Sequence, residues 1–410
     1  MEKINLALTV IGGLAIFVYG MGLMSDGLKE IAGEKLKSAL GYMTRNRFFA
    51  ILAGAGVTAL IQSSSATSVM TVGFVNAGLL SLQQAIGVIF GANIGTTITG
   101  QIVSFKLDDI ALPAVTAGVI GLMIAKRVFS RGIWRTVLGF GLLFFGMTIM
   151  STELKELAAE PGFKKFFELF DCSPTNGYMP ILSVLGAITV GTLCTMLVQS
   201  SSATIGITIA LANSGVISIW SAIPIVLGDN IGTTITANIA ASVANVSARR
   251  AAMAHSVFNV FGVIWALVLF RPFLSLVGRI IEFLGFPNPA ADGFLVNDPE
   301  GADGTAALYG LSMLHTLFNT INTLILIWFV KFIEKAVMWI IKAPKNQEKE
   351  VFKLKYISAG PLATPELATE QAFDEIIHFA QISRNGLGYT KQALVETNED
   401  KFEELRKKLV

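Results

Sequence analysis

The hexapeptide Gln62-Ser-Ser-Ser-Ala-Thr67 occurs twice in this chain of 410 residues, and its second copy is Gln199-Ser-Ser-Ser-Ala-Thr204. The similarity continues on both sides of the hexapeptide. Aligning residues 51–100 with residues 188–237 without a gap gives 24 identities in 50 positions. Self-similarity at this level over so long a stretch indicates an internal duplication, and the fold must accommodate the same unit twice.

A second motif follows each hexapeptide after the same interval. Gly91-Ala-Asn-Ile-Gly-Thr-Thr-Ile-Thr99 returns at residues 228–236 with Asp229 in place of Ala92. Asp229 is the only ionisable acid between residues 172 and 248, and an acid inside a membrane is by default a functional group. Three uses are open for it: cation ligand, proton carrier or structural acid.

The duplication extends toward the N-terminus with a different spacing. Met24-Ser25 recurs as Met150-Ser151, so the stretch between this pair and the serine motif is longer in the second unit than in the first. We therefore expect a first repeat at residues 1–130 and a second repeat, with a final helix, at residues 131–342.

Charge is distributed unevenly along the chain. Only 15% of the residues are charged, 53% are hydrophobic and the mean hydropathy is +0.63, which argues against a soluble enzyme. Residues 48–105 and 305–330 carry no charged side chain. A membrane-spanning helix needs about 20 apolar residues, so these stretches predict membrane helices. The first helix is expected to be a membrane span and not a signal peptide.

Basic residues in short loops mark the cytoplasmic side. They form three clusters, at residues 29–47, 126–135 and 249–250. Placing all three inside predicts an alternating path that begins inward and leaves the C-terminus cytoplasmic, with helices at residues 5–24, 84–104, 109–127, 135–151, 219–243, 250–270 and 307–332. Three crossings then separate matching helices. The expected fold is an all-α polytopic membrane protein with two inverted-topology repeats.

The serine motifs do not fit this path as full spans. The uncharged arms on either side of Gln62 have about 14 and 13 residues, so each reaches roughly 20 Å, less than the bilayer core of about 30 Å. We expect a re-entrant hairpin in each repeat with the serines at its tip, buried in protein near the midplane. The paired glycines around Asn93 and Asn230 predict a broken helix in each repeat.

Two such tips can bind an anion without basic side chains. The start of a helix exposes amide groups with partial positive charge, and each serine hydroxyl donates a hydrogen bond. The carbonyls that end the first arm, together with Asn, Thr and Gln oxygens, suit a group I cation. His255-x3-Asn259 and His315-x3-Asn319 each place a histidine and an asparagine one helical turn apart, which favours packing and hydrogen bonds between helices.

At its paired Gln-Ser-Ser-Ser and Asn-Ile-Gly-Thr-Thr motifs the sequence resembles the bacterial branch of the type II sodium-phosphate cotransporter family, over roughly residues 5–340. The resemblance implies a cell (inner) membrane transporter that takes up inorganic phosphate with sodium by alternating access. It implies no enzyme activity, no organic cofactor and no nucleic-acid partner. It also implies that a linker, residues 343–364, leads to the start of a cytoplasmic PhoU-like helical domain, residues 365–410.

The resemblance also assigns the site. The implied phosphate ligands are Ser63, Ser64, Ser65, Ser200, Ser201 and Ser202. The implied sodium ligands are Gln62, Thr67, Asn93, Thr96, Thr97, Gln199, Thr204, Asn230, Thr233 and Thr234. Asp229 joins the sodium set because of the asymmetry between the repeats.

Other functions remain open from the residues alone. A sodium- or proton-coupled transporter of another oxyanion has the same features, and the number of sodium ions per phosphate is not fixed by them. A phosphate sensor or scaffold and an intramembrane serine hydrolase are further alternatives. The hydrolase needs one activated serine beside a base, Ser64 or Ser201 with His255 or His315, whereas the chain has two equal serine triplets.

Overall fold

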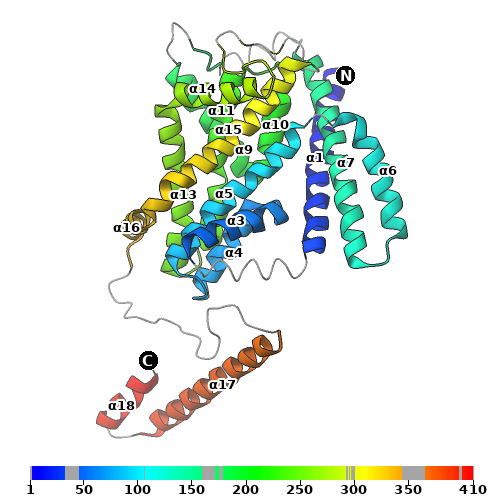
Figure 1. Ribbon diagram of the computed structural model, residues 1–410. Coiled ribbons are helices and arrows are strands. Elements are labelled where there is room, and N and C mark those ends of the chain that lie inside the picture. Colours follow the sequence, from blue (N-terminus) through cyan, green and yellow to red (C-terminus); the bar gives the residue numbers. More distant parts are fainter. Residues whose placement is uncertain are drawn as a thin grey trace. The chain divides into compact units, whose positions relative to one another are not determined.

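The computed structural model describes residues 2–32, 46–105, 107–158, 171–174, 179–291, 294, 296, 301–343, 365–396 and 399–409. In chain order the helices are α1 (Glu2–Ala32), α3 (Arg47–Ile61), α4 (Ser64–Asn76), α5 (Leu82–Ser104), α6 (Asp108–Ile124), α7 (Val128–Ala158), α9 (Ile181–Val198), α10 (Ser201–Asn213), α11 (Ile219–Gly232), α12 (Thr234–Ala241), α13 (Val246–Val268), α14 (Phe270–Phe283), α15 (Ala302–Leu326), the short η1 (Ile327–Phe329), α16 (Val330–Ile340), α17 (Pro365–Val395) and α18 (Glu399–Leu409) (Figure 1).

Within these described ranges, five helices are long and apolar enough to cross a membrane, namely α1, α5, α7, α9 and α13. The chain is therefore an all-α polytopic membrane protein, as the sequence predicts. It divides into two units, Met1–Ala343 and Pro344–Val410. In the second unit α17 packs on α18. The predicted linker from residue 344 onward, and the basic residues Lys35, Lys37 and Arg45, lie outside the described residues.

Helices α1, α6 and α7 form one group of the first unit (Figure 1). Helices α1 and α7, which match each other in the duplication, pack antiparallel along their length. Their contact is made by regularly spaced glycines, with Gly13, Gly20 and Gly27 of α1 opposite Gly146, Gly139 and Gly132 of α7. Small residues let membrane helices approach until their backbones touch. The inverted relation of the two whole repeats stays a prediction.

Replacing Gly20 by leucine is expected to separate α1 from α7 and to lower the melting temperature of the detergent-solubilised protein. A Cβ atom on Gly20 would lie 2.5 Å from the amide nitrogen of Leu143 and 2.8 Å from the carbonyl oxygen of Gly139, and neither backbone atom can move away freely. Overpacking of this kind costs about 1–3 kcal/mol or more. The matched control is Gly22→Leu on the same helix, where nothing lies within 4 Å. Equal melting temperatures for the two variants would contradict this packing.

Each repeat builds a hairpin that packs on the long helix following it. In the first repeat α3 and α4 form the hairpin and α3 packs on α5; in the second, α9 and α10 form it and α9 packs on α11. The close contacts repeat as well. A Cβ on Gly54 would lie 2.1 Å from the Val88 carbonyl oxygen, and one on Gly191 would lie 2.1 Å from that of Ile225. The duplicated sequence therefore gives duplicated packing.

The predicted broken helix of the first repeat is wrong, because α5 runs without interruption from Leu82 to Ser104. In the second repeat the helix divides into α11 and α12 at Thr233, within the predicted motif, although Thr233 keeps helical backbone angles (φ −57°, ψ −27°). The glycines serve another purpose: a Cβ on Gly91 would lie 1.9 Å from the Ile51 carbonyl oxygen, so this glycine allows α3 to approach α5 closely. The sequence pattern did not distinguish close packing from a weakened helix.

Candidate functional site

Each hairpin turns on one glutamine. Gln62 (φ 57°) and Gln199 (φ 54°) are the non-glycine residues with positive φ in the described part of the chain. Ser63 and Ser200 follow as the N-caps of α4 and α10, and their hydroxyl oxygens accept the amides of Ala66 (3.1 Å) and Ala203 (3.2 Å). An N-cap serine satisfies one of the free amides that begin a helix. The tip is thus Gln-Ser, and the remaining serines form the first turn of the second arm.

The serine hydroxyls at the two helix starts are largely removed from solvent. Ser64 and Ser201 are buried, at 3% and 8% exposure, and Ser202 is buried as well. Ser63, Ser65 and Ser200 are half-buried. Hydroxyl donors next to the positive end of a helix dipole are suited to an anion. The predicted phosphate ligands therefore lie at two helix N-termini, with the same local geometry in both repeats.

The surroundings of the two tips differ. At the first tip, Thr99 of α5 donates to Oε1 of Gln62 (2.7 Å), and Ser25 of α1 donates to the carbonyl oxygen of Ile61. At the second tip Gln199 is exposed. Within the described ranges Ser151, the repeat counterpart of Ser25, makes no such bond to α9. The first tip is therefore held by α1 and α5, whereas the Gln199 side chain of the second tip is exposed.

A threonine pair lies behind each tip. The Thr58 hydroxyl donates to that of Thr67 (2.9 Å) in the first repeat, and the Thr195 and Thr204 hydroxyls lie 3.0 Å apart in the second. All four are buried. Thr58 and Thr195 align in the duplication, but the sequence analysis did not select them, because an isolated threonine in an apolar helix is a weak signal.

The second repeat adds a carboxylate to this pair. Asp229 is fully buried, and its Oδ1 accepts a hydrogen bond from Thr195 (2.7 Å). Its Oδ2 finds no hydrogen-bond partner among the described residues. A buried acid of this kind is costly unless it is paired or coordinates a cation. The acid, the two threonines and the second tip thus form one cluster of oxygen atoms.

The remaining predicted sodium ligands lie on α5, α11 and α12, where all are buried. Their donor groups bind carbonyls of their own helices, as in the bonds from Asn93 to Ile89 and from Asn230 to Val226 (both 2.8 Å). The same holds for Thr96, Thr97, Thr233 and Thr234. The hydroxyl oxygens of Thr96, Thr97 and Thr233 and the amide oxygen of Asn93 accept no hydrogen bond from a described residue, whereas Thr234 accepts one from Ser256 (3.2 Å). Asn319 of α15, which the sequence analysis did not assign to the site, donates to Oδ1 of Asn230 (3.3 Å).

Comparison with known proteins identifies the family. A family model described as Na+/Pi-cotransporter matches residues 16–152 and 182–287, which include both serine tips. The chain belongs to the Na+/Pi-cotransporter family. This confirms the family expected from the sequence, and because this is a family of transporters the chain is a transporter and not an enzyme. The predicted PhoU-like domain stays a prediction.

Several known proteins resemble this chain. It is 34% identical over 280 residues to the uncharacterized protein YqeW of Bacillus subtilis, covering 68% of this chain and 85% of the relative. It is 25% identical over 370 residues to the putative inorganic phosphate export protein YjbB of Salmonella typhimurium, covering 90% of this chain and 62% of that protein's length. The human sodium-dependent phosphate transport protein 2B is 32% identical over 105 residues, which are 25% of this chain and 15% of the human protein. No solved structure matches the chain.

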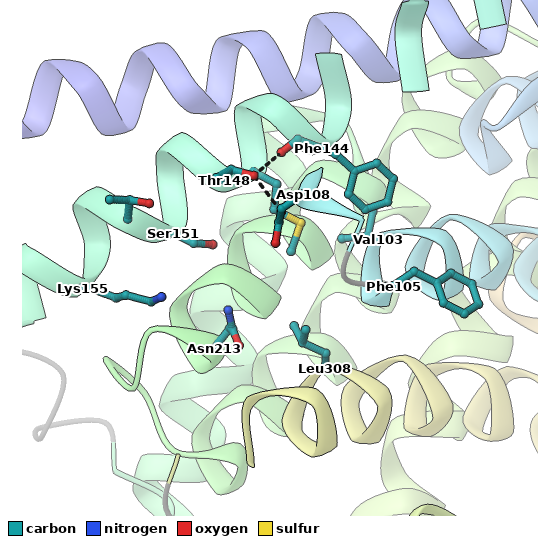
Figure 2. Close-up of a pocket in the computed structure, with 11 residues that line it drawn as sticks. Val103, Phe105, Asp108, Phe144, Thr148, Ser151, Lys155, Asn213 and Leu308 are labelled. Carbon is teal, nitrogen blue, oxygen red and sulfur yellow. Dashed lines mark hydrogen bonds between the residues drawn. The ribbon is translucent and has the colours of Figure 1, made fainter. Parts of the chain in front are cut away.

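A cavity of about 160 Å³ lies elsewhere in the first unit (Figure 2). It contains no tip residue and lies between α5, α6, α7, α10 and α15. Thr148 donates to Asp108 there (2.7 Å), and the Asn213 side chain extends toward the cavity from the end of α10. The Oδ1 atom of Asn213 is buried without a partner among the described residues, whereas its repeat counterpart Asn76 accepts the amide of Asn245 (2.8 Å). Ser151 also lines the cavity.

Replacing Gln199 by glycine is expected to preserve or raise stability, by about 1 kcal/mol, because glycine adopts positive φ without steric strain. The same change removes the side-chain oxygen of the second tip, and we expect the sodium concentration for half-maximal phosphate uptake to rise at least about tenfold. Melting temperature and sodium-dependent uptake are measured on one preparation. Unchanged uptake in the glycine variant would show that the tip uses only the backbone of this residue.

Proposed function

We propose that this phosphate transporter takes up inorganic phosphate together with sodium and holds the phosphate between its two Gln-Ser-Ser-Ser tips. The observation that carries the proposal is the doubled tip: two helix N-termini, each with three serines and the same capping geometry. Residues 48–81 and 181–218, which include both tips, contain no lysine or arginine. Helix amides and hydroxyls are then the donors for the anion, a known way for a protein to bind phosphate.

Sodium binds beside these tips in the proposed mechanism. The ligands are oxygen atoms of the buried Asn and Thr side chains of the second motif, of the glutamines at the tips and of Thr67 and Thr204. Asp229 supplies a negative charge to the site of the second repeat, where its Oδ2 accepts no hydrogen bond from any described residue. A cation there compensates a carboxylate that would otherwise be buried unpaired. Sodium ions bound at the neutral oxygen ligands and at Asp229 place positive charge next to the bound phosphate.

Alternating access is the proposed way in which the site opens to each side. The hairpins are re-entrant, the repeats are inverted and the hairpin-bearing core moves against α1, α6 and α7. The antiparallel packing of α1 on α7 supports the inverted arrangement, and the unequal surroundings of the two tips support a state in which α1 and α5 hold the first tip only. The proposed location is the cell (inner) membrane, with the C-terminus in the cytoplasm.

The test is uptake of labelled phosphate into proteoliposomes that contain the purified full chain. We expect accumulation driven by an inward sodium gradient and no accumulation when potassium replaces sodium. The number of sodium ions per phosphate follows from the effect of membrane potential on uptake. Three sodium ions with one divalent phosphate carry one net positive charge, and each 100 mV then contributes about 2.3 kcal/mol to the driving force. Two sodium ions with one divalent phosphate carry no net charge, and uptake is then independent of the potential. Sodium-independent uptake, proton-driven uptake or a preference for sulfate would overturn the assignment. Flux above that of empty vesicles excludes a pure sensor.

Phosphate export is a second candidate, because the YjbB proteins matched over 90% and 98% of this chain are named as putative exporters. The same vesicles test it when they are preloaded with labelled phosphate. Efflux that proceeds without sodium on either side of the membrane would favour export. Efflux that needs internal sodium would instead be the reverse of the coupled uptake reaction.

A further inference from the structure

The short helix α16 differs from the long membrane helices in length and direction. Its 11 residues reach roughly 16 Å, which is about half of the bilayer core, so α16 cannot cross a membrane. Figure 1 shows α16 end-on at the edge of the first unit, whereas α1 and α7 run lengthwise through the view. Helix α16 therefore lies across the direction of the membrane helices.

One face of α16 is part of the core of the first unit. Val330, Ile333 and Val337 are buried (4%, 2% and 0% exposed) and belong to the same apolar cluster as Phe90 of α5 and Phe258 of α13. This packing on α5 and α13 fixes how α16 is rotated about its own axis. The other side chains of the helix then have defined directions.

Arginines from two other helices hold the ends of α16. Arg47, at the start of α3, donates to the carbonyl oxygen of Ile327 (3.2 Å) in η1, directly before α16. Arg250, near the start of α13, donates to the carbonyl oxygen of Ile341 (3.0 Å), which follows its last residue. Carbonyls at helix ends have no partner within the helix, so both bonds stabilise this arrangement. Helix α16 is thereby connected to the first hairpin and to α13.

The side of α16 that faces away from the core has a basic part and an aromatic part. Lys331 and Lys335 are one turn apart, and Phe332 and Trp339 are two turns apart. At about 100° per residue the two aromatic side chains lie next to the two lysines around the helix. All four are exposed, Phe332 at 68% and Trp339 at 76%. The helix therefore presents a basic strip beside an aromatic strip.

The positive charge of the basic strip is not compensated by the acid of the same helix. Glu334 accepts a hydrogen bond from Gln83 of α5 (2.7 Å). Lys331, Lys335 and the exposed Lys342 beyond the helix form no ion pair with a described residue, since the ion pairs in those ranges join other side chains. Their charge is available to an anionic surface.

We propose that α16 lies in the headgroup layer of the bilayer and binds anionic phospholipid there. Lysines beside aromatic residues are typical of helices in this layer, where the rings enter the acyl boundary and the lysine stems extend their ammonium groups to the lipid phosphates. In the predicted topology the leaflet is the cytoplasmic one, whose surface is negatively charged. The inference does not depend on the serine tips or on the proposed function.

A lipid surface accounts for both strips at once. Aromatic side chains alone bind neutral and anionic lipid equally, whereas each lysine near an anionic surface strengthens binding about fivefold. Because Arg47 and Arg250 connect α16 to α3 and α13, lipid bound at α16 also stabilises the position of these helices. The melting temperature of the whole chain therefore reports on this binding.

The depth of Trp339 in the bilayer is the first test. The full chain is reconstituted in vesicles of phosphatidylcholine and phosphatidylglycerol that contain lipid brominated either next to the headgroup or at the chain end. Trp339 emission is the difference between the wild type and Trp339→Phe. We expect stronger quenching by bromine next to the headgroup. Stronger quenching from the chain end would place α16 in the hydrocarbon, and no quenching would mean that the second unit or another copy covers it; either result would overturn the inference.

The second test addresses charge, by titrating the detergent-solubilised full chain with phosphatidylglycerol and, in parallel, with phosphatidylcholine. We expect phosphatidylglycerol to raise the melting temperature more. In Lys331→Gln/Lys335→Gln the phosphatidylglycerol concentration for half of that rise should increase at least about tenfold, because two lysines are lost. Lys331→Arg/Lys335→Arg keeps the charge and should respond as the wild type does. Lys391→Gln, in α17 of the second unit, is the control for loss of charge elsewhere.

Both lysines are exposed, so the glutamine variant should melt at the wild-type temperature when no lipid is added. If it melts lower, Lys335→Gln alone takes its place, with an expected increase of about fivefold. A wild-type response to phosphatidylglycerol in the glutamine variant would show that the basic strip binds no anionic lipid. An equal effect of the two lipids on the wild type would contradict the inference in the same way.

Discussion

Replacing Ser64 and Ser201 together by alanine is expected to reduce phosphate uptake by at least about 100-fold, to the background of empty vesicles. Each change removes a buried hydroxyl at a helix N-terminus. A hydrogen bond to a charged group contributes about 1.5–3 kcal/mol, so two lost bonds account for this factor. Folding should be retained, because the caps of both helices, Ser63 and Ser200, remain in place. The measurement is the initial rate of sodium-driven uptake at equal amounts of reconstituted protein.

The control for the serine pair is Ser214→Ala, at the opposite end of α10, where the hydroxyl binds the carbonyl oxygen of Ala210 (2.8 Å). This variant should transport at the wild-type rate. Each single change, Ser64→Ala or Ser201→Ala, should give an intermediate rate, which shows whether both tips contribute. A wild-type rate in the double variant would move the phosphate site away from the tips.

Replacing Asp229 by asparagine is expected to raise the sodium concentration needed for half-maximal uptake on the order of 100-fold, because the variant loses the negative charge that faces a desolvated cation. Asparagine keeps the shape and can still accept the hydrogen bond from Thr195, so packing is preserved. Sodium dependence is measured at saturating phosphate. By thermodynamic linkage the apparent phosphate affinity at low sodium should weaken by a similar factor.

Asp109→Asn is the matched control for this second prediction. Asp109 is an exposed acid in the first turn of α6, away from both tips. Its replacement should leave the sodium dependence unchanged. If Asp229→Asn also has wild-type sodium dependence but a different dependence on pH, Asp229 carries a proton and the sodium sites consist of neutral oxygens only.

Much of the fold could be predicted from the sequence because the patterns that indicate it extend over many residues. The charge-free stretches and the doubled motifs identified the hairpins and the helices that follow them. Helices α14 and α16 were not predicted, because each is amphipathic and carries charges that interrupt an apolar run. The continuity of α5 was also missed, since glycine has the same appearance in a sequence whether it weakens a helix or admits a neighbouring backbone.

The site was predicted only as far as local motifs extend. The serines, asparagines and threonines of the repeated segments were assigned from the family resemblance that the repeated motifs carry. Their partners Ser25, Thr195 and Asn319 come from other helices and are single polar residues in apolar sequence, so only the packing reveals them. The backbone of Gln62 and Gln199 was equally hidden, because a left-handed conformation is expected of glycine and not of glutamine.

The hydrogen bond from Ser25 to the first tip has no counterpart at Ser151 among the described residues, although the two serines are repeat mates. In the proposed alternating-access mechanism, the two halves exchange the environments of these serines between two states, using contacts of the same kind. The two states then differ only where the sequences of the halves diverge. Asp229, which is aligned with Ala92 of the first repeat, is one position at which the two halves differ. One carboxylate can therefore set the balance between the two states, and a cation that neutralises it can shift that balance.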